Sequence, residues 1–448
     1  MKKLRILALL LAAVLAVLPL SGCGGVEQTN DGLTIYLSSK TRKYLQKVIG
    51  GFESYSGLSV TVTDLSDISE DDFAERLASE LMNGRGPDVV LLDEDFMRRR
   101  DVYKMMKSGV FADIGAMLDE YPDMEWEEYN HAVMEQGIWE GKRYLLPLSY
   151  QLPVLLTAEG LLAESGFDVN QCSDFSGFIQ QAAPIVEEWN RDARSHRLFG
   201  AGMTFANYPM WIDNPFNYNE RSVQVDTPAF REAAKFYQAL YPQELAGPTD
   251  PHGLIDRWIL EGDRSRLFEN NQEYIHLTGI CAAYIQTYDK AKLLPVRGSD
   301  GGTHAEITRV VAINANSPNL KIASEFVYRM LTRYQYASMI GDIPVHNPFV
   351  TDTLENVDRE EAVWGFYYFI EDELGTRVLN GYEGNFKPVE RSFLEEYEDW
   401  CVNLSGATFP TPAWEKLYEL MIPYYKGEAD YETCIKKAQE QLTLYMTE

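Results

Sequence analysis

Residues 33–92 alternate between two hydrophobic periodicities, and no other feature of the chain constrains its fold as strongly. Three short apolar runs, at 33–37, 58–62 and 88–92, have the length and composition of strands. Two segments between them repeat apolar side chains every three to four residues, as one face of a helix does. The order strand, helix, strand, helix, strand predicts an α/β fold with a mainly parallel sheet and right-handed crossovers.

Helix boundaries can also be placed from the sequence. The first of these two helical segments begins near Tyr44 and ends at Gly57, and the second ends at the turn residues 84–87. Beyond residue 150 the pattern becomes more helical. Thr227-Pro228 and Ser317-Pro318 each combine a capping residue with a proline, which favours a helix start. Apolar residues also recur every three to four positions at 435–445, which predicts a helix near the C-terminus.

Length and charge limit the classes of protein that fit. The 448 residues suggest two or three domains, and 40 basic against 68 acidic side chains give a net charge of −28. Affinity for a phosphate backbone comes mainly from Lys and Arg, so this charge argues against nucleic acid as a partner. It also argues against binding to an anionic membrane through basic patches.

The N-terminus predicts export. Basic residues at 2, 3 and 5 precede an apolar run at 6–20 that is shorter than the roughly 20 residues of a membrane span. The run ends in Leu-Ser-Gly-Cys at 20–23, which resembles the lipobox of bacterial lipoproteins. This resemblance implies removal of residues 1–22 and a lipid on Cys23, followed by a flexible tether at 23–31. The alternative is an ordinary signal peptide that happens to end near a cysteine.

Polar residues follow two of the predicted strands. Ser38 and Ser39 come after the first strand, and Asp93, Glu94 and Asp95 come after the third. Ligands of open α/β sheets gather at the carboxyl ends of strands. These residues are therefore candidates for a binding site, while a solvated acidic loop is the alternative interpretation of 93–95.

Several short motifs occur in the order in which they are found in one known family. They are Pro-Asp-Val-Val-Leu-Leu-Asp at 87–93, Gly-Val-Phe-Ala-Asp-Ile at 109–114, Glu-Gly-Lys-Arg-Tyr-Leu-Leu-Pro at 140–147, Val-Ala-Ile-Asn at 311–314 and Asp-Ile-Pro-Val at 342–345. With the lipobox, this order resembles the extracellular solute-binding proteins of ABC importers, in the family that includes maltose-binding and other carbohydrate-binding proteins. Each motif is short, and the order of the motifs carries the resemblance.

The resemblance implies a two-lobe periplasmic-binding-protein fold (a Venus flytrap). One lobe would hold 32–150 and 284–340, and the other 151–283 and 341–448. The chain would cross between the lobes near 149–151 and near 308–309, and these crossings would act as hinges.

The resemblance also suggests ligand contacts. The segment 205–214 lacks clear periodicity and falls where the family places a ligand-facing aromatic side chain. Its candidates are Asn207, Tyr208, Trp211 and Asp213, with a packed loop anchor as the alternative. Tyr284 is the ring nearest to another aromatic position of the family. Gln151 and Arg309 lie in the two crossings, where Arg309 could instead form only a salt bridge.

These features predict a monomeric, lipid-anchored receptor on the outer face of the cell membrane. It would capture a small solute, most simply a mono- or oligosaccharide, and deliver it to an ABC permease without a cofactor or a required metal. Positions 155–158 and 280–281 depart from the family pattern, so a polyamine or a peptide is an alternative solute.

A hydrolase such as a glycosidase is the competing class, although no nucleophile elbow or zinc motif occurs. The pairing of Cys172, Cys281, Cys401 and Cys434 stays open.

Overall fold

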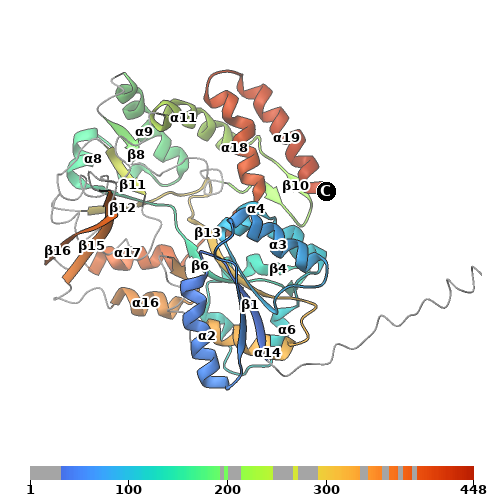
Figure 1. Cartoon of the computed structure of the whole chain (residues 1–448). Coiled ribbons are helices and arrows are strands. Elements are labelled where there is room, and N and C mark those ends of the chain that lie inside the picture. The colour runs from blue at the N-terminus through green and yellow to red at the C-terminus, as the bar shows by residue number, and fades with distance from the viewer. Residues whose placement is uncertain are drawn as a thin grey trace, which may run out of the picture.

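The computed structural model describes residues 32–191, 196–199, 213–245, 266–270, 291–332, 342–355, 363–371, 377–385 and 391–448. These residues form a seven-stranded sheet, a four-stranded sheet and three two-stranded pairs, with helices around them (Figure 1). The predicted α/β class is confirmed. Within the described residues, no helix combines the length and the apolar character needed to cross a bilayer.

The seven-stranded sheet is mixed. Its order is β14-β6-β13-β3-β1-β2, with β17 beside β13. The strands are β1 (Leu33–Leu37), β2 (Val60–Asp64), β3 (Val89–Asp93), β6 (Leu146–Gln151), β13 (His304–Ile313), β14 (Ile343–Pro344) and β17 (Gly406–Thr408). β1 is parallel to β2 and β3, as the sequence predicts, whereas β13 is antiparallel to β3 and β6.

The helices that accompany this sheet include three that the sequence predicts, the two between the first three strands and the one after Ser317-Pro318. They are α2 (Arg42–Ser56), α3 (Glu70–Met82), α4 (Glu94–Arg99), α5 (Val102–Ser108), α6 (Ile114–Leu118), α7 (His131–Met134) and α14 (Leu320–Thr332). Gly57 ends α2 with a φ of 70°, a left-handed conformation that suits glycine. Ser69 begins α3 by accepting a hydrogen bond from the backbone N–H of Asp72 at 3.1 Å.

The four-stranded sheet lies in a second group of elements, in the upper part of Figure 1. Its order is β12-β7-β11-β8, formed by β7 (Val154–Ala158), β8 (Arg197–Phe199), β11 (Arg266–Asn270) and β12 (Ala291–Pro295). The helices of this group are α8 (Glu159–Ser165), α9 (Phe175–Asn190), α11 (Pro228–Leu245), α18 (Pro412–Tyr425) and α19 (Tyr431–Thr447). The predicted helices after Pro228 and over 435–445 are therefore present, and Phe230, Ala234 and Leu442 on their apolar faces are buried.

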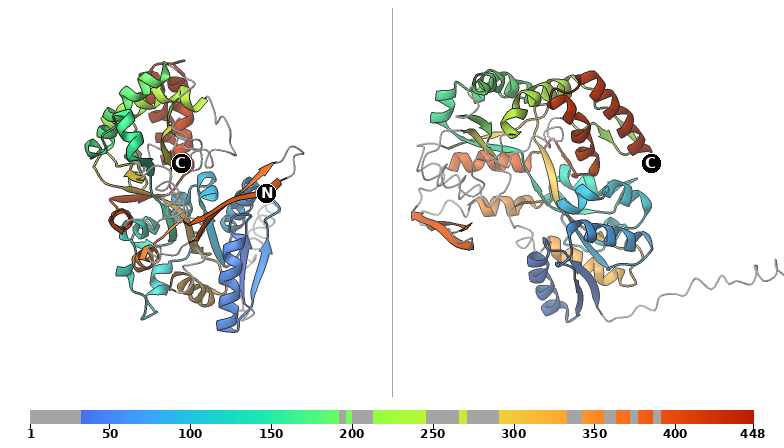
Figure 2. Two further views of the ribbon diagram at one scale, coloured as in Figure 1. Left: turned by 90° about the vertical axis from the view of Figure 1, so that its left-hand side faces the viewer. Right: turned by 45° about the horizontal axis from the view of Figure 1, so that its top comes forward.

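The remaining elements are short or lie at the side of the molecule. They are the strand pairs β4 (Ile138–Trp139) with β5 (Lys142–Arg143), β9 (Phe216–Asn217) with β10 (Ser222–Val223) and β15 (Val363–Glu371) with β16 (Arg377–Asn385), the helices α16 (Asn347–Glu355) and α17 (Arg391–Val402), and the 3₁₀ turns Trp126–Glu128, Glu135–Gly137 and Val169–Gln171. The β15–β16 hairpin stands at one side (Figure 2).

The chain passes between the two large sheets twice in the described residues. β6 ends at Gln151 and β7 begins at Val154, so the first passage follows the predicted crossing at 149–151. The return lies at 296–303, before β13, which belongs to the first sheet throughout its length. Strand pairing also puts β12 in the second sheet and β14 and β17 in the first, opposite to the ranges predicted for the lobes. The lobe boundaries as a whole stay a prediction.

Candidate functional site

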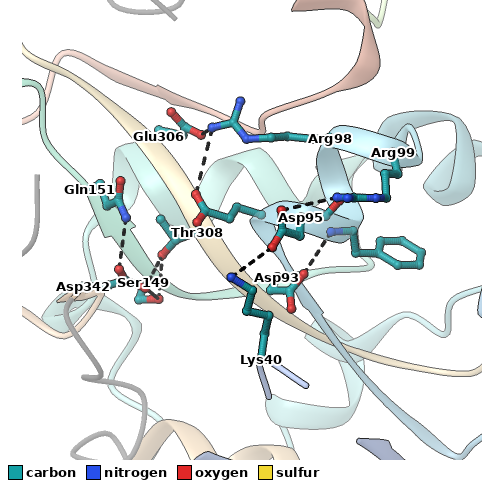
Figure 3. A network of polar contacts seen from close by, with 12 residues as sticks. Lys40, Asp93, Asp95, Arg98, Arg99, Ser149, Gln151, Glu306, Thr308 and Asp342 are labelled. Carbon is teal, nitrogen blue, oxygen red and sulfur yellow. Dashed lines mark hydrogen bonds and ion pairs between the residues drawn. The ribbon is translucent and has the colours of Figure 1, made fainter. Parts of the chain in front are cut away.

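Polar side chains gather where β3 ends and α4 begins, against the neighbouring strands β6 and β13 (Figure 3). The set includes residues from β6, α4 and β13, the residue just before β14, and Lys40 after β1. Because β1 and β3 are parallel, their carboxyl ends meet at this edge of the sheet. This is the place at which the sequence predicts a binding site.

Asp342 is the centre of one half of this network. Its Oδ2 accepts hydrogen bonds from Thr308 Oγ1 at 2.7 Å and Ser149 Oγ at 3.2 Å, and its Oδ1 accepts one from Gln151 Nε2 at 3.2 Å. Arg309 Nη1 forms an ion pair with Oδ2 at 2.6 Å. Asp342 is only 3% exposed, so these contacts replace the water that a carboxylate requires. They link β6 and β13 to the start of β14.

Glu306 and Arg98 form the second buried ion pair. Glu306 lies on β13, is 2% exposed, and accepts a hydrogen bond from the guanidinium of Arg98 on α4. Burial raises the pKa of Glu306, and the positive charge of Arg98 opposes that rise. Arg98 also approaches Glu94 Oε2, at 4.0 Å.

Glu94 is a poorly compensated carboxylate. Its pKa is raised to about 7, first by desolvation and then by the negative charges of Glu306 and Asp342, while Arg98 opposes the rise. Its side chain is still 41% exposed. Glu94 is therefore accessible to solvent, and near neutral pH it exists in both the protonated and the ionised form.

The alternative interpretation of 93–95 as a solvated loop is wrong. Asp93 ends β3 and caps α4, because its Oδ1 accepts a hydrogen bond from the backbone N–H of Phe96 at 2.9 Å. Burial raises the pKa of Asp93. Glu94 and Asp95 form the first turn of α4, and Asp95 makes ion pairs with Lys40 at 3.4 Å and with Arg99 at 3.3 Å. A capping aspartate after a buried strand was the signal for this helix.

Ser38 and Ser39 differ in their surroundings. Ser38 is buried, and its hydroxyl and backbone N–H bond with the hydroxyl of Thr41 at 3.1 and 3.0 Å, which shapes the turn into α2. Ser39 is exposed and its hydroxyl donates to Glu70. In this structure both serines thus have partners within the protein, and Lys40 is the residue of this turn that reaches α4.

The structure brings four of the predicted residues together. Arg309 lies opposite Asp93 in the sheet register, Gln151 and Arg309 share Asp342, and Glu94 begins the adjacent helix. Arg309 does form the expected alternative, a salt bridge. Asp213 is exposed and has no hydrogen bond or ion pair among the described contacts. The other predicted sites, Cys23, Asn207, Tyr208, Trp211 and Tyr284, lie outside the described residues.

The sequence-based prediction missed several members of the network. Ser149 and Thr308 were predicted only as hinge positions, Asp342 only as part of a motif, and Arg98 and Glu306 were not singled out. Glu306 carried a usable signal, because a charge inside an apolar strand has to be paired. In the part of the chain that the structure describes, no group of three metal-ligating side chains could hold a metal ion.

This arrangement provides hydrogen-bond donors and acceptors held in fixed positions, as a polar ligand requires. Residues 38–252 match the model of the bacterial extracellular solute-binding proteins. Residues 38–252, just under half of the chain, therefore belong to this family. Among curated proteins, no sequence matches that of this solute-binding protein.

Solved structures with the same fold cover 93% of this solute-binding protein. The sugar-binding protein MalE from Xanthomonas citri is 12% identical, covered over 97% of its chain, with a TM-score of 0.64. The cyclic alpha-maltosyl-1,6-maltose binding protein from Arthrobacter globiformis is 15% identical, covered over 98%, with a TM-score of 0.60. The ABC transporter associated binding protein from B. animalis subsp. lactis Bl-04, solved with beta-1,6-galactobiose, is 15% identical, covered over 98%, with a TM-score of 0.56. At these identities they establish the shared fold.

Proposed function

We propose that this solute-binding protein captures a mono- or oligosaccharide and passes it to the permease of an ABC importer. The family match over residues 38–252 is the observation that carries the proposal. The similar structures named above support the choice of solute, since two are sugar-binding proteins and the third was solved with a bound sugar. The protein would act as a receptor without catalysing a reaction, anchored outside the cytoplasm by a lipid on Cys23.

The polar network supports this function chemically. Sugars are bound by hydrogen bonds around their hydroxyl groups and by aromatic rings against their apolar faces. Gln151, Arg309 and Glu94 would supply the hydrogen bonds. Tyr208, Trp211 and Tyr284 stay predictions for the rings. A ligand that touches both lobes only when they are close together would shift the population toward the closed form.

A cationic solute such as a polyamine is a second candidate, and the surroundings of Glu94 favour it. The nearest cationic group among its described contacts, Arg98, is 4.0 Å away, and Glu306 and Asp342 add negative charge nearby. A protonated amine would therefore gain more from Glu94 than a sugar hydroxyl would.

A thermal-shift screen tests the function. The chain from residue 24 onward contains every described residue and would be screened against saccharides, amino acids, peptides and polyamines. A ligand that binds only the folded protein stabilises it by about 2.7 kcal/mol at a hundredfold excess over its dissociation constant. A saccharide that raises the melting temperature supports the proposal. A polyamine or peptide alone would keep the receptor and remove the sugar, and cleavage of chromogenic glycosides without any shift would replace the receptor with a hydrolase.

Two variants test the predicted contacts. Trp211→Ala and Arg309→Met are expected to weaken binding of the identified ligand about tenfold or more, measured by isothermal titration calorimetry. Arg231→Met is the matched control, because Arg231 pairs with Asp226 at 3.0 Å on the exposed surface of α11. If all three variants bind equally well, these contacts are wrong.

The lipid anchor has its own test. In a bacterial host, the wild-type chain should incorporate labelled palmitate and sediment with membranes, and Cys23→Ser should lose both properties. Incorporation of label by Cys23→Ser, or release of the wild-type chain into the medium, would contradict the anchor.

A further inference from the structure

Asp342 holds two predicted ligand contacts at once. Gln151 donates to its Oδ1 at 3.2 Å, and Arg309 pairs with its Oδ2 at 2.6 Å. The hydroxyls of Thr308 and Ser149 also donate to Oδ2, at 2.7 and 3.2 Å. These four donors come from two different strands, so Asp342 fixes their relative positions. Figure 3 shows three of them, Ser149, Gln151 and Thr308, around Asp342.

Burial distinguishes Asp342 from two of its partners, Gln151 and Arg309. Asp342 is 3% exposed, whereas the Arg309 side chain is 19% exposed and Gln151 is half-buried. A solute at this edge of the sheet would meet Gln151 and Arg309 and would not reach the carboxylate behind them. Long side chains lose conformational freedom when they bind, and a partner that already holds them reduces this loss.

The carboxylate also sets the charge of the site. At 2.6 Å, Asp342 compensates the positive charge of Arg309. The pair then offers N–H donors without a net positive charge, which suits the hydroxyl groups of a neutral sugar. Without the carboxylate, Asp342 would no longer compensate the positive charge of Arg309, and a guanidinium forms paired hydrogen bonds with carboxylates.

We propose that Asp342 is a positioning and specificity-determining residue: through Gln151 and Arg309 it selects neutral saccharides over saccharides that carry a carboxylate. This inference rests on the proposed function and names the class of saccharide that the site accepts. Asp342 does not touch the solute and acts only through the two side chains that it holds.

A double-mutant cycle tests the positioning role. Asp342→Asn keeps the size of the side chain and removes its charge, and it should weaken binding of the neutral saccharide found in the screen about tenfold, measured by calorimetry. Arg309→Met should also weaken binding, and adding Asp342→Asn to it should cost little more, because the shared interaction is already lost. Additive losses, or no loss in Asp342→Asn, would overturn the inference.

The selectivity measurement reports what a purely structural role would not change. Binding of glucose and glucuronate, and of galactose and galacturonate, would be compared in the wild type, Asp342→Asn and the control Asp430→Asn. Asp430 caps α19 through the backbone N–H of Thr433 at 2.8 Å, so its variant should lose stability and keep the wild-type preference. Asp342→Asn should shift the preference at least tenfold toward the acidic sugars.

The outcomes separate the two proposals. A wild type that binds no saccharide of either kind ends the proposed function, and this inference falls with it. A wild type that binds neutral saccharides while Asp342→Asn keeps the same preference leaves the function in place and overturns the inference alone. If Asp342→Asn does not fold, Gln151→Leu is measured in its place, and its affinities for acidic and for neutral saccharides are compared. Weaker binding of neutral saccharides with an unchanged ratio of the two affinities supports the inference. Unchanged binding overturns it.

Discussion

Tyr44 shows how much a single hydrogen bond decides at the residue scale. It is 2% exposed on α2, and it is the only tyrosine among the described residues whose buried hydroxyl has no hydrogen-bond partner. Tyr150 on β6 is equally buried, but its hydroxyl donates to the backbone oxygen of Cys401 at 2.8 Å. The two tyrosines form a matched pair for measuring the value of this bond.

We expect opposite results when each hydroxyl is removed. Tyr44→Phe relieves the burial of an unpaired hydroxyl and should raise the free energy of unfolding by up to about 1 kcal/mol, whereas Tyr150→Phe leaves a buried carbonyl unpaired and should lower it by about 1–2 kcal/mol. Denaturant unfolding measures both values. A loss of stability in Tyr44→Phe would mean that its hydroxyl has a partner in solution.

Glu94 should make stability depend on pH. Its folded-state pKa, about 7, lies above the ordinary value of 4.5, so between these values the folded protein binds more protons than the unfolded chain. The free energy of unfolding should then fall as pH rises through this window. Glu94→Gln removes the effect and should be more stable than the wild type above pH 7, by about 1 kcal/mol after allowance for solvent screening of a partly exposed side chain.

Unfolding curves collected across this window test the sign. The difference between Glu94→Gln and the wild type should shrink toward pH 4.5 and be largest above pH 7. Glu75→Gln, an exposed change on α3, should follow the wild type at every pH. A difference that does not vary with pH would contradict the raised pKa.

At the scale of elements, α2 contains a natural comparison of two glycines. Gly57 has a φ of 70°, and Gly50 lies inside the helix with open space around the position of a Cβ atom. Gly57→Ala should lower the free energy of unfolding by about 1 kcal/mol because a left-handed φ strains any L side chain. Gly50→Ala should raise it by roughly 0.5–1 kcal/mol through helix propensity. Thermal melts that move in the same direction would show that the end of α2 is misplaced.

Local patterns predicted the elements whose signals are local. The first parallel strands, α2, α3, α11 and α19 all follow from hydrophobic periodicity with a capping residue, a glycine or a proline at an end. α4 was not predicted, because its capping residue, Asp93, belongs to an acidic run that also fits a loop. The mixed character of the sheet was not predicted for a different reason. β13 pairs with β3 and β6, which lie more than 150 residues earlier, and nothing in the sequence of β13 specifies these partners.

The candidate site was only partly predictable for the same reason. Gln151 and Arg309 were found because they fall in the crossings that the family resemblance implies. Their common partner Asp342 is 33 residues from Arg309 in the chain, and only folding brings the two together. The aromatic candidates Tyr208, Trp211 and Tyr284 lie outside the described residues and stay predictions.

At the scale of the whole molecule, the C-terminal helix α19 is tied to α5, more than 300 residues earlier. Tyr445 donates its hydroxyl to Asp101 Oδ2 at 2.5 Å, and Lys104 donates to the backbone oxygen of Tyr445 at 2.6 Å. The ammonium of Lys104 also lies 3.8 Å from the centre of the Tyr445 ring. α19 packs on α18 and β10, so these contacts join the elements around the first sheet to those of the second group.

Tyr445→Phe should therefore weaken a contact between the two parts of the molecule. It removes a hydrogen bond from Asp101, a carboxylate that is 9% exposed, and should lower the free energy of unfolding by about 1–2 kcal/mol. The hydroxyl of Tyr445 lowers the pKa of Asp101, which burial raises, so the bond stabilises the ionised form. The loss should consequently be largest at neutral pH and decrease as Asp101 becomes protonated at acidic pH.

Denaturant unfolding at neutral and acidic pH separates this contact from simple packing. Leu444→Ala is the control, since Leu444 is 59% exposed on the same turn and its removal should change stability by less than about 0.5 kcal/mol at either pH. A Tyr445→Phe loss that stays the same at both pH values would show that Asp101 is not its partner. A loss confined to neutral pH would show that the hydrogen bond from Tyr445 to the charged Asp101 contributes to holding α19 against α5, and that segments more than 300 residues apart stabilise each other across the two sheets.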